Sequence, residues 1–408
     1  MKINKTKKVR VVVTGLGVIS SLGFGKDRFW ENLIKGKSGI SKVDSFDTID
    51  HSTHFGGEVR DFNPDDFMSR KKAQVMGRAS HLAIAATKLA FKDAKLDCKK
   101  LLFENTAVFL GTTGGESQKI EEMDAVWLEK GVDAIDRMSI IQYPVSNISS
   151  NVALEFRVKG KTQIFTTACA AGNYAIGYGF DFLRLGKADM VIAGGSDAFS
   201  YLSYTGFNQV RAIAPEICQP FDKNRKGMIP GEGAGIIILE TLESAQKRNA
   251  HIYAEIAGYG LSCDAFHMTN PQVEGVSACM ESALKHSGII PEDVDYISAH
   301  GTGTKFNDRT ESTSIKKIFG SRKVPVSSIK SMLGHTMGAA SAIEALTCCL
   351  TIENSLIPPT INHETSDAEC DIDCVPNVAR KHTVDIALNN GFAFGGNNAS
   401  VVIKKFKD

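Results

Sequence analysis

The sequence predicts an α/β protein with two similar halves, and three observations support this fold class. Segments typical of buried strands alternate with segments typical of helices of ordinary length along the chain. Four motifs of the first half recur in the same order in the second half. The chain has 408 residues, of which 43% are hydrophobic and 23% charged, and this is enough to bury a large core. The alternation further predicts parallel βαβ units.

The individual elements are predicted from the length and composition of each segment. Short apolar runs bounded by glycine or polar residues are expected to be strands, and the longer segments between them helices. The expected strands are 10–14, 107–110, 163–166, 190–193, 235–240, 294–299, 324–328, 384–388 and 400–404. The expected helices are 26–35, 78–92, 173–185, 275–287, 308–319 and 338–351.

Weak internal repeats indicate a duplication. VVVTGLGVIS (11–20) resembles YAEIAGYGLS (253–262), and both are expected to be a strand that runs into a glycine turn. In the same order along the chain, LAFKDA matches SALKHS, ENTAVFLGTTGG matches VDYISAHGTGT, and TTACAAG matches SMLGHTMGAAS. Chance similarity between α/β units is the alternative, because each match alone is poor.

The duplication predicts an N-terminal half over 1–250 and a C-terminal half over 251–408. Residues 40–76 and 115–150 have no counterpart in the second half. They are expected to be insertions that form a cap or a subunit contact.

Charge and cysteine content argue for a cytoplasmic protein. The net charge is +1, so nothing in the overall charge points to nucleic acid or to an anionic membrane surface. The apolar run 11–13 is too short for a signal peptide or a membrane span. The nine cysteines are scattered and odd in number, which favours a reducing compartment over a disulfide framework.

The stretch TTACAAG (166–172) places Cys169 between an expected strand and an expected helix. Helix N-terminal N–H groups favour an anion and lower a thiol pKa from about 8.5 to roughly 3.5–7.5. The same groups stabilise the oxyanion of a thioester under attack, and the small neighbours leave room for a carbonyl. The stretch therefore predicts a nucleophile for acyl transfer. The alternative is a buried structural cysteine, which is our interpretation of the other eight.

Two histidines are candidate partners for the thiol. SAHGTGT places His300 at the end of an expected strand, and SSIKSMLGHTMGAAS places His335 before an expected helix, with Lys330 five residues earlier. Ligands of α/β sheets bind at the carboxyl ends of strands. Both histidines follow expected strands at corresponding places in the duplicated units, so we expect them to meet Cys169 in one cleft.

Three further patterns give weaker evidence for a functional site. The glycine loop of LNNGFAFGGNNAS allows close approach of backbone to a ligand, although a turn with core aromatics is the alternative. VTGLGVISSLG resembles a dinucleotide fingerprint but lacks the third glycine and the acidic residue that follows it. Cys370, Cys374 and His363 fit no strong zinc spacing, so a surface loop is the preferred interpretation.

Together the motifs resemble the β-ketoacyl-(acyl carrier protein) synthases, specifically the elongating, synthase II-like condensing enzymes of the thiolase fold. The resemblance runs nearly end to end. It implies two duplicated halves in an α-β-α-β-α layered structure. The Cys-His-His order is that of the elongating branch, whereas the initiating branch and the plant-type polyketide synthases have Cys-His-Asn. The motifs that carry the resemblance are TACAAG, HGTGTKFND, SSIKSMLGHTMGAASAIEA, QPFDKNRKGMIPGEGAG and FAFGG.

The resemblance implies roles for the candidate residues. Cys169 accepts the acyl chain as a thioester. His300 and His335 support decarboxylation of the malonyl unit and stabilise the enolate, each as a neutral imidazole that donates from Nε2. Lys330 orders the site, paired with Glu344.

The remaining site residues also follow from the resemblance. The N–H groups of Cys169 and Phe394 form the oxyanion hole, and Phe394 is the gatekeeper for the acyl chain. Thr302 and Thr304 hold the phosphopantetheine arm. The other expected residues are Thr113 and Phe392 in the substrate pocket, and Asp308 and Glu311 behind the catalytic groups.

The resemblance also implies the partners. No metal or redox cofactor is required, because the phosphopantetheine belongs to the acyl carrier protein that delivers both the acyl and the malonyl unit. A homodimer is expected, or a heterodimer with a chain-length-factor-like subunit in a polyketide pathway. The basic residues expected to meet the acidic carrier protein are Lys71, Lys72, Arg78 and Arg137.

Departures from the family pattern cluster at the expected docking face and chain pocket. Gln74, Val75 and Met138 stand where a basic residue is often found, and Thr113 stands where an aliphatic residue often lines the acyl pocket. We therefore expect a dedicated carrier protein in a specialised pathway, such as a type II polyketide or polyene.

Two other assignments are alternatives. A thiolase acting on acyl-CoA normally uses a second cysteine, and GHTMG speaks against it. A chain-length-factor-like subunit usually lacks the nucleophile.

Overall fold

Eleven strands form one continuous sheet, made of two sets of five and the short β2 (Gly23–Phe24), which pairs with β1. The computed structural model describes residues 9–97 and 103–407. The first set is β1 (Val11–Ser20), β5 (Thr106–Gly111), β6 (Thr162–Phe165), β7 (Met190–Asp197) and β8 (Gly233–Thr241). The second set is β9 (Ala254–Cys263), β10 (Tyr296–Ser298), β11 (Val326–Ser327), β14 (Ile386–Phe392) and β15 (Asn397–Lys404).

Both sets have the same strand order. The order is β6-β5-β7-β8-β1 in the first set and β11-β10-β14-β15-β9 in the second, and β1 meets β9 where the sets join. In each set the strand that is third along the chain lies at the edge. In the first set this strand is β6, which pairs in parallel with β5, and β5 pairs in parallel with β7. In the second set it is β11, which pairs in parallel with β10, and β10 pairs in parallel with β14. The fifth strand is antiparallel to both the fourth and the first. An internal duplication predicts this shared order.

The sheet is mixed, so the predicted parallel units make up only part of each set. Only the first three strands of each set in spatial order are parallel. The reason is visible between β14 and β15, where residues 393–396 are too few for a crossover and must form a hairpin.

The expected glycine turns at 11–20 and 253–262 are wrong, because β1 and β9 continue as strands through these glycines. A Cβ at Gly17 would lie 1.9 Å from a backbone oxygen of the covering helix, and one at Gly260 would lie 2.2 Å from the corresponding backbone. The glycines therefore permit close helix–sheet packing. The helices concerned are α3 (Arg78–Asp93) and α9 (Val273–Ser287).

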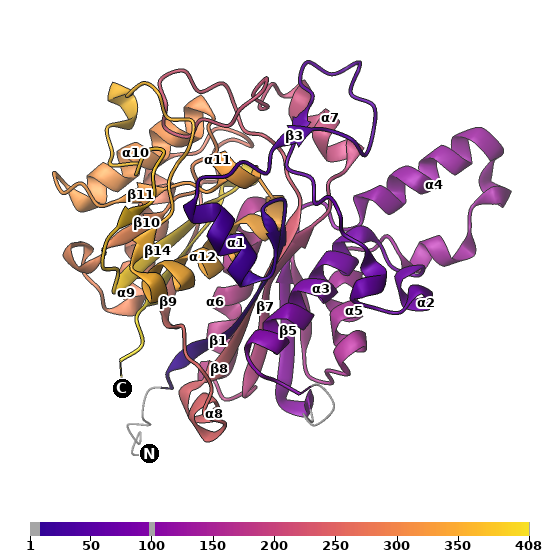
Figure 1. Cartoon of the computed structure of the whole chain (residues 1–408), viewed down its shortest axis with the longest axis horizontal. Coiled ribbons are helices and arrows are strands. Elements are labelled where there is room, and N and C mark those ends of the chain that lie inside the picture. Colours follow the sequence, from indigo (N-terminus) through magenta and orange to yellow (C-terminus); the bar gives the residue numbers. More distant parts are fainter. Residues whose placement is uncertain (1–8, 98–102, 408) are drawn as a thin grey trace.

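The helices complete five layers, α-β-α-β-α, as predicted (Figure 1). α3 and α5 (Asn147–Phe156) cover the outer face of the first set, and α9 and α10 (Lys305–Phe319) cover that of the second. α6 (Ala171–Arg184) and α12 (Ala340–Asn354) form the central layer and contact strands of both sets.

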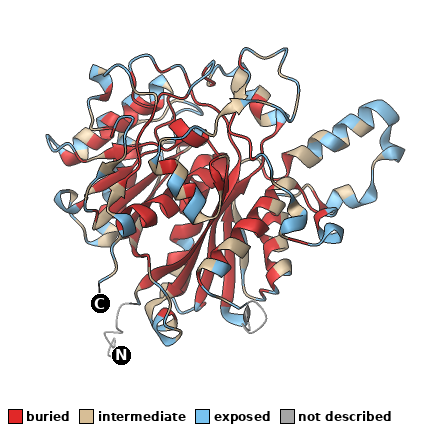
Figure 2. Ribbon diagram, in the orientation of Figure 1, coloured by how far each residue is buried: buried red, intermediate tan, exposed pale blue. Residues whose placement is uncertain are grey.

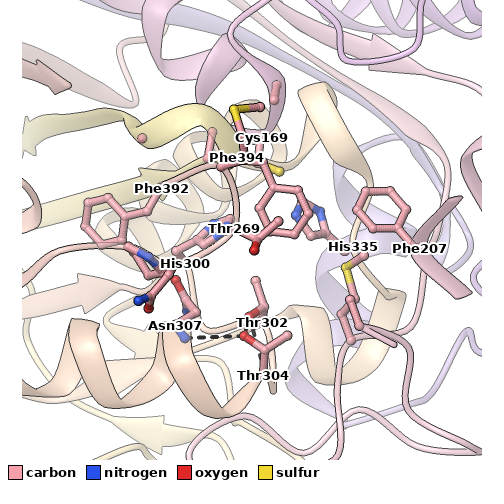
Figure 3. A pocket seen from close by; sticks show the side chains of 18 of the residues that line it. Cys169, Phe207, Thr269, His300, Thr302, Thr304, Asn307, His335, Phe392 and Phe394 are labelled. Atoms are coloured by element: carbon pink, nitrogen blue, oxygen red, sulfur yellow. Dashed lines mark hydrogen bonds between the residues drawn. The ribbon is translucent and has the colours of Figure 1, made fainter. Parts of the chain in front are cut away.

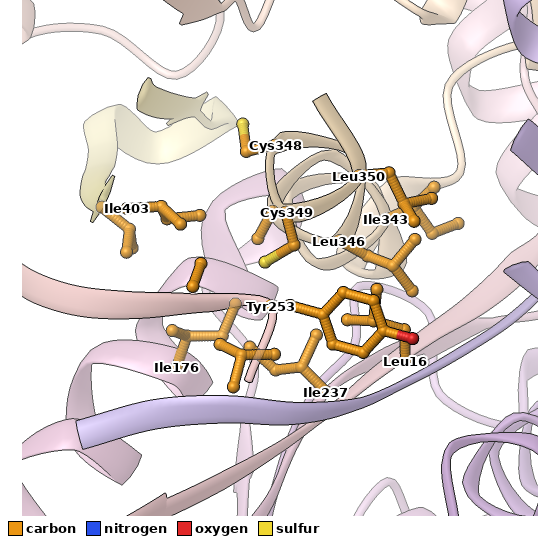
Figure 4. Packing of buried hydrophobic residues seen from close by; sticks show 14 of the residues in the cluster. Leu16, Ile176, Ile237, Tyr253, Ile343, Leu346, Cys348, Cys349, Leu350 and Ile403 are labelled. Atoms are coloured by element: carbon orange, nitrogen blue, oxygen red, sulfur yellow. The ribbon is translucent and has the colours of Figure 1, made fainter. Parts of the chain in front are cut away.

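Most of the central layer is buried (Figure 2). Every residue of α12 from Ala340 to Ile352 is buried, as expected for a helix with protein on all sides. Figure 4 shows Ile343, Leu346 and Leu350 of this helix packed with Ile237 of β8 and other side chains of the same apolar cluster. This packing fixes the N-termini of α6 and α12, where the candidate residues lie.

The expected insertions carry elements that the sequence did not indicate. Residues 115–150 contain α4 (Ser117–Lys130), which projects from the body in Figure 1 and is mostly exposed in Figure 2.

The remaining helices and strands are α1 (Lys26–Ile34), β3 (Ser41–Lys42), β4 (Phe55–Gly56), α2 (Arg70–Ala73), α7 (Tyr201–Gln209), α8 (Leu242–Lys247), α11 (Lys330–Leu333), β12 (Leu356–Ile357) and β13 (Arg380–Lys381). Across 9–97 and 103–407, no helix combines the length and apolar character that crossing a membrane requires.

Candidate active site

One cavity collects the candidate residues at the carboxyl ends of the strands (Figure 3). Cys169 follows β6, His300 follows β10, His335 follows β11 and Phe394 follows β14. Chain segments from both halves therefore meet here, as in other α/β sheets whose ligands bind at this edge. The lining residues that the sequence predicted are Thr113, Cys169, His300, Thr302, Thr304, His335, Phe392 and Phe394.

Cys169 lies in a single 3-10 turn, Ala168–Ala170, directly before α6. The preceding Ala168 has a φ of +48°, a sharp turn between strand and helix that aims the thiol into the cavity. Burial raises the pKa of the Cys169 thiol to about 12, and the charge of Lys330 opposes this effect. The expectation of a lowered pKa is therefore wrong, because it considered the helix N-terminus and not the loss of water around the sulfur.

The two histidines converge on the thiol. One ring nitrogen of each histidine and the Cys169 Sγ all lie within 4.8 Å of one another, and the ring centroids of His300 and His335 are 5.4 Å apart. Burial lowers the pKa of both imidazoles well below the usual value, and the nearby charge of Lys330 lowers it further. Both rings are therefore neutral at physiological pH.

The proton of His335 is placed by a backbone contact. The Met337 N–H donates to Nδ1 of His335 at 3.1 Å, so the neutral ring carries its proton on Nε2. His300 has no such contact, because its Nδ1 is buried without a hydrogen-bond partner in the described structure. The backbone of His300 is held instead, by a carboxylate of α10.

Two carboxylates of α10 hold the His300 loop. Glu311 accepts the N–H groups of His300 at 2.9 Å and Gly301 at 2.8 Å, and burial raises the pKa of this carboxyl to about 7. Asp308 accepts the N–H groups of Gly303 and Phe221. Both residues thus lie behind the catalytic groups, where the sequence placed them, and bind the loop rather than the cavity.

Lys330 and Glu344 form an ion pair behind the cavity, and each side chain is only 1% exposed. Burial raises the pKa of the Glu344 carboxyl to about 7, and the Lys330 ammonium opposes the rise. One Glu344 oxygen, Oε2, has no hydrogen-bond partner in the described structure. Neither side chain lines the cavity, so Lys330 acts on the thiol and the imidazoles through its charge.

The hairpin loop between β14 and β15 carries Phe394 at the cavity mouth. Its ring is 39% exposed and lies 5.9 Å from the ring of Phe207, whereas Phe392 is buried with its ring 6.0 Å from His300. Within the described ranges, the N–H groups of Cys169 and Phe394 donate to no other residue. Both amides are therefore available to a ligand.

The three candidate threonines all reach the cavity. The hydroxyls of Thr302 and Thr304 are 2.9 Å apart, at the loop that follows His300. The Thr113 hydroxyl is buried and has no hydrogen-bond partner in the described part of the chain. It is thus a polar group in an otherwise largely apolar cavity.

The expected docking residues differ in their surroundings. Lys71 and Arg137 are exposed, and Lys72 is exposed but paired with Glu155 at 2.6 Å. Arg78 instead donates to both oxygens of the buried Glu232. Its expected docking role is wrong, because a carboxylate inside the protein already occupies the guanidinium.

The described structure also excludes the zinc site and the dinucleotide site that two sequence patterns suggested. Cys370 and Cys374 are buried in an apolar cluster rather than in a surface loop, and in the described structure they form no convergent group with His363. Residues 13–23 belong mostly to β1, which leaves no glycine loop for a dinucleotide.

Some lining residues were missed from the sequence. Phe207 belongs to α7, and 267–271 connects β9 to α9, and both segments form one wall of the cavity. No repeat signal indicated 267–271, because the corresponding connection of the first half, between β1 and α3, contributes no described residue to the cavity lining. Phe207 carried no signal, because α7 has no counterpart among the four repeats.

Comparisons with known proteins place the chain in a family. Models described as Beta-ketoacyl synthase, N-terminal domain, and Beta-ketoacyl synthase, C-terminal domain, match residues 8–245 and 253–364. The 3-oxoacyl-[acyl-carrier-protein] synthase 2 of Synechocystis sp. is 42% identical, covering 98% of this chain and 99% of the relative.

Two solved structures are similar over the same length. "The ishigamide ketosynthase/chain length factor" has a TM-score of 0.96 at 42% identity, covering 98% of this chain and 100% of that one. A type II PKS acyl-carrier protein in complex with its ketosynthase, bound to the hexaketide, gives a TM-score of 0.90 at 34% identity, with 98% and 100% covered. The chain belongs to the beta-ketoacyl synthase family.

Proposed function

We propose that this protein is a 3-oxoacyl-(acyl carrier protein) synthase that joins an acyl chain on Cys169 to a malonyl unit, with loss of carbon dioxide. The observation that carries the proposal is the meeting of one thiol, two neutral imidazoles and two free amides in one cavity. The family membership and the full-length similarity to 3-oxoacyl synthases support it.

The first half-reaction is acyl transfer. Sγ of Cys169 attacks the carbonyl carbon of an acyl thioester, and the N–H groups of Cys169 and Phe394 hold the oxyanion. The thiol is protonated at rest, since its pKa is raised to about 12, so its proton leaves as the C–S bond forms. The carrier thiolate departs and takes up a proton. Splitting the reaction at this covalent stage replaces one difficult step with two easier ones.

The second half-reaction forms the carbon–carbon bond. The malonyl C–C bond to the carboxylate breaks, carbon dioxide leaves, and the electron pair becomes an enolate whose oxygen is held by the two imidazoles. The Nε2–H of His335 is placed to donate there. The enolate carbon attacks the acyl carbonyl, the C–S bond breaks, and the Cys169 sulfur regains a proton. A neutral imidazole suffices, because it donates a hydrogen bond without a buried charge.

The experiment that tests this function is reconstitution from purified components. The protein is incubated with acyl carrier protein loaded with saturated, polyunsaturated or polyketo chains, together with malonyl carrier protein. We expect a carrier-bound 3-oxoacyl product, seen by mass spectrometry, and one carbon dioxide per turnover. Absence of both products with every donor, alone and with a chain-length-factor-like subunit, would contradict the proposal.

The partner we propose is an acyl carrier protein whose phosphopantetheine arm enters along Thr302 and Thr304. The two hydroxyls line the cavity and have only each other as side-chain partners among the described residues. A carrier protein is bound by a ketosynthase in one of the similar solved structures. An acidic carrier would be attracted by the exposed Lys71 and Arg137.

Charge reversal at Lys71 tests this docking face. Lys71→Glu is expected to lower kcat/KM for the carrier protein roughly threefold to tenfold, mainly through KM, because a rim charge affects encounter more than chemistry. The difference from the unmodified protein should shrink as salt increases. Lys317→Glu, at the far end of α10 from the cavity, is the matched control and should leave kcat/KM unchanged. An equal loss in both variants would rule out docking at Lys71.

We further propose a second copy of the chain, or a chain-length-factor-like subunit, as a stable partner. The projecting α4 region exposes Trp127 at 55% and Leu128 at 83%, and Ile140 and Ile141 follow nearby at 60% and 55%. In the described sheet, β6 is an edge strand and pairs with β5 alone. Exposed apolar side chains and a free strand edge are each typical of a protein interface.

A specialised pathway remains our proposal for the biological setting. Two observations support it: the unpaired Thr113 hydroxyl in the cavity, and the exposed Gln74, Val75 and Met138 at the docking face. The acyl panel above addresses it, since preferred loading of polyketo or polyunsaturated chains supports a polyketide or polyene route and preferred loading of long saturated chains supports fatty-acid elongation. The intact Cys169, His300 and His335 argue against a purely non-catalytic subunit.

A further inference from the structure

Asp197, the last residue of β7, is a buried carboxylate with four hydrogen-bond donors. Its Oδ1 accepts the Thr112 hydroxyl at 2.7 Å and the Gly114 N–H at 2.8 Å. Its Oδ2 accepts the Thr113 N–H at 2.7 Å and the Gly338 N–H at 2.6 Å. A carboxylate is acceptor-only when ionised, and all four contacts use this property.

The four donors come from opposite halves of the chain. Residues 112–114 follow β5 and bring Thr113 into the cavity. Gly338 lies in the 3-10 turn Met337–Ala339 that leads into α12. The adjoining Met337 N–H is the group that donates to Nδ1 of His335. Hydrogen bonds on either side of the Met337 backbone therefore connect the pocket loop, through Asp197 and the 3-10 turn, to the imidazole.

We propose that Asp197 is a positioning residue that joins the acyl-pocket loop to the His335 turn, so that the imidazole keeps its Nε2–H aimed at the reacting carbonyl. The proposal rests on the condensing function proposed above. Asp197 does not line the cavity, so it acts through the backbone of its neighbours and not by touching substrate.

The negative charge of Asp197 has a second effect, on the thiol. Together with burial and Glu344, it raises the pKa of Cys169, whereas the Lys330 ammonium lowers it. The neutral rings of His300 and His335 are the other titratable groups next to the sulfur. Removing the Asp197 charge should therefore make the thiol more acidic, although the same change weakens the support of His335.

The test is Asp197→Asn in the full-length protein, with two readouts. The reactivity of the Cys169 thiol should increase, and the turnover should decrease. The pH profile of Cys169 alkylation by iodoacetamide, followed by peptide mass spectrometry, should shift to lower pH. The kcat of condensation should fall about tenfold with little change in the KM for malonyl carrier protein, because a transition-state interaction is lost. A protein that had merely lost packing would not combine a more acidic Cys169 thiol with a slower turnover.

Two further variants separate charge from structure. Thr112→Val removes one donor but keeps the Asp197 charge, so it should lower kcat slightly and leave the alkylation profile in place. Asp295→Asn removes a carboxylate that accepts two backbone N–H groups at the opposite end of β14, and it should change neither readout.

Three results would overturn the inference: an unshifted alkylation profile in Asp197→Asn, an unchanged kcat in that variant, or the same alkylation shift in Thr112→Val. Alkylation needs no substrate. If the condensing function itself were wrong, the unmodified protein would form no product while the alkylation shift would still appear, so the two failures are distinguishable.

Discussion

Cys169→Ala is expected to abolish acyl-enzyme formation and to lower condensation roughly a thousandfold or more. The reason is that the thiol is the covalent acceptor of the acyl chain and no other described cysteine lines the cavity. Decarboxylation of malonyl carrier protein should persist, because that step depends on the two imidazoles and not on the sulfur. Intact-mass spectrometry after incubation with acyl donors, together with measurement of released carbon dioxide, checks both parts.

Two comparison variants sharpen this prediction. His335→Ala should show the opposite pattern, with a normal mass gain on Cys169 and little carbon dioxide. Cys263→Ser replaces the exposed cysteine among those described and should behave like the unmodified protein in both assays. A mass gain that survives in Cys169→Ala would show that another residue carries the acyl chain.

Lys330→Ala is expected to destabilise the protein by about 3–5 kcal/mol, because it leaves the buried Glu344 carboxylate without its partner. Activity should fall as well, since the ammonium opposes the rise that burial causes in the pKa of the Cys169 thiol, and it adds to burial in lowering the pKa of both imidazoles. Chemical denaturation gives the free energy of unfolding, and the alkylation pH profile of Cys169 should shift to higher pH.

The loss of stability in Lys330→Ala should depend on pH. Burial already raises the pKa of Glu344 to about 7 with the lysine present, and removing the lysine raises it further. A carboxyl whose pKa is higher in the folded state binds more protons there than in the unfolded state, so the folded state gains stability as pH falls. The variant should therefore be less destabilised at pH 5 than at pH 8.

A double variant distinguishes the two roles of the pair. Lys330→Met with Glu344→Leu removes both charges and should recover most of the stability, because two apolar groups replace a desolvated ion pair. It should not recover activity, since the positive charge beside the thiol is still missing. Recovery of turnover together with stability would show that the ion pair is only structural.

The sequence predicted the site better than the sheet that carries it. Cys169, His300 and His335 each follow a recognisable strand, and strand ends meet at one edge of an α/β sheet, so their convergence was predictable. Strand directions were not, because helix–strand alternation alone does not distinguish a crossover from the hairpin at 393–396. The glycines of β1 were misassigned for a similar reason, since a close helix and a turn both require the absence of a Cβ.

Burial and long-range contacts account for the other differences. The pKa of the Cys169 thiol depends on how much water the folded chain removes, which no local motif specifies. Arg78 was predicted to dock the carrier protein because its partner could not be recognised from the sequence. That partner, the buried Glu232, lies 154 positions further along the chain. Asp197 gave no sequence signal, because its four donors lie 83 to 141 residues away.

The equal strand order of the two sets has a consequence for how this site arose. Cys169 and His335 both follow the edge strand that is third in its set, and each precedes a helix of the central layer. In an ancestor made of two identical subunits, any mutation would have placed the same residue at both positions. A thiol in one half opposite an imidazole in the other therefore requires two copies of the gene that mutate independently. Fusion of the two copies into one chain then ensures that each thiol-bearing half is always paired with one imidazole-bearing half.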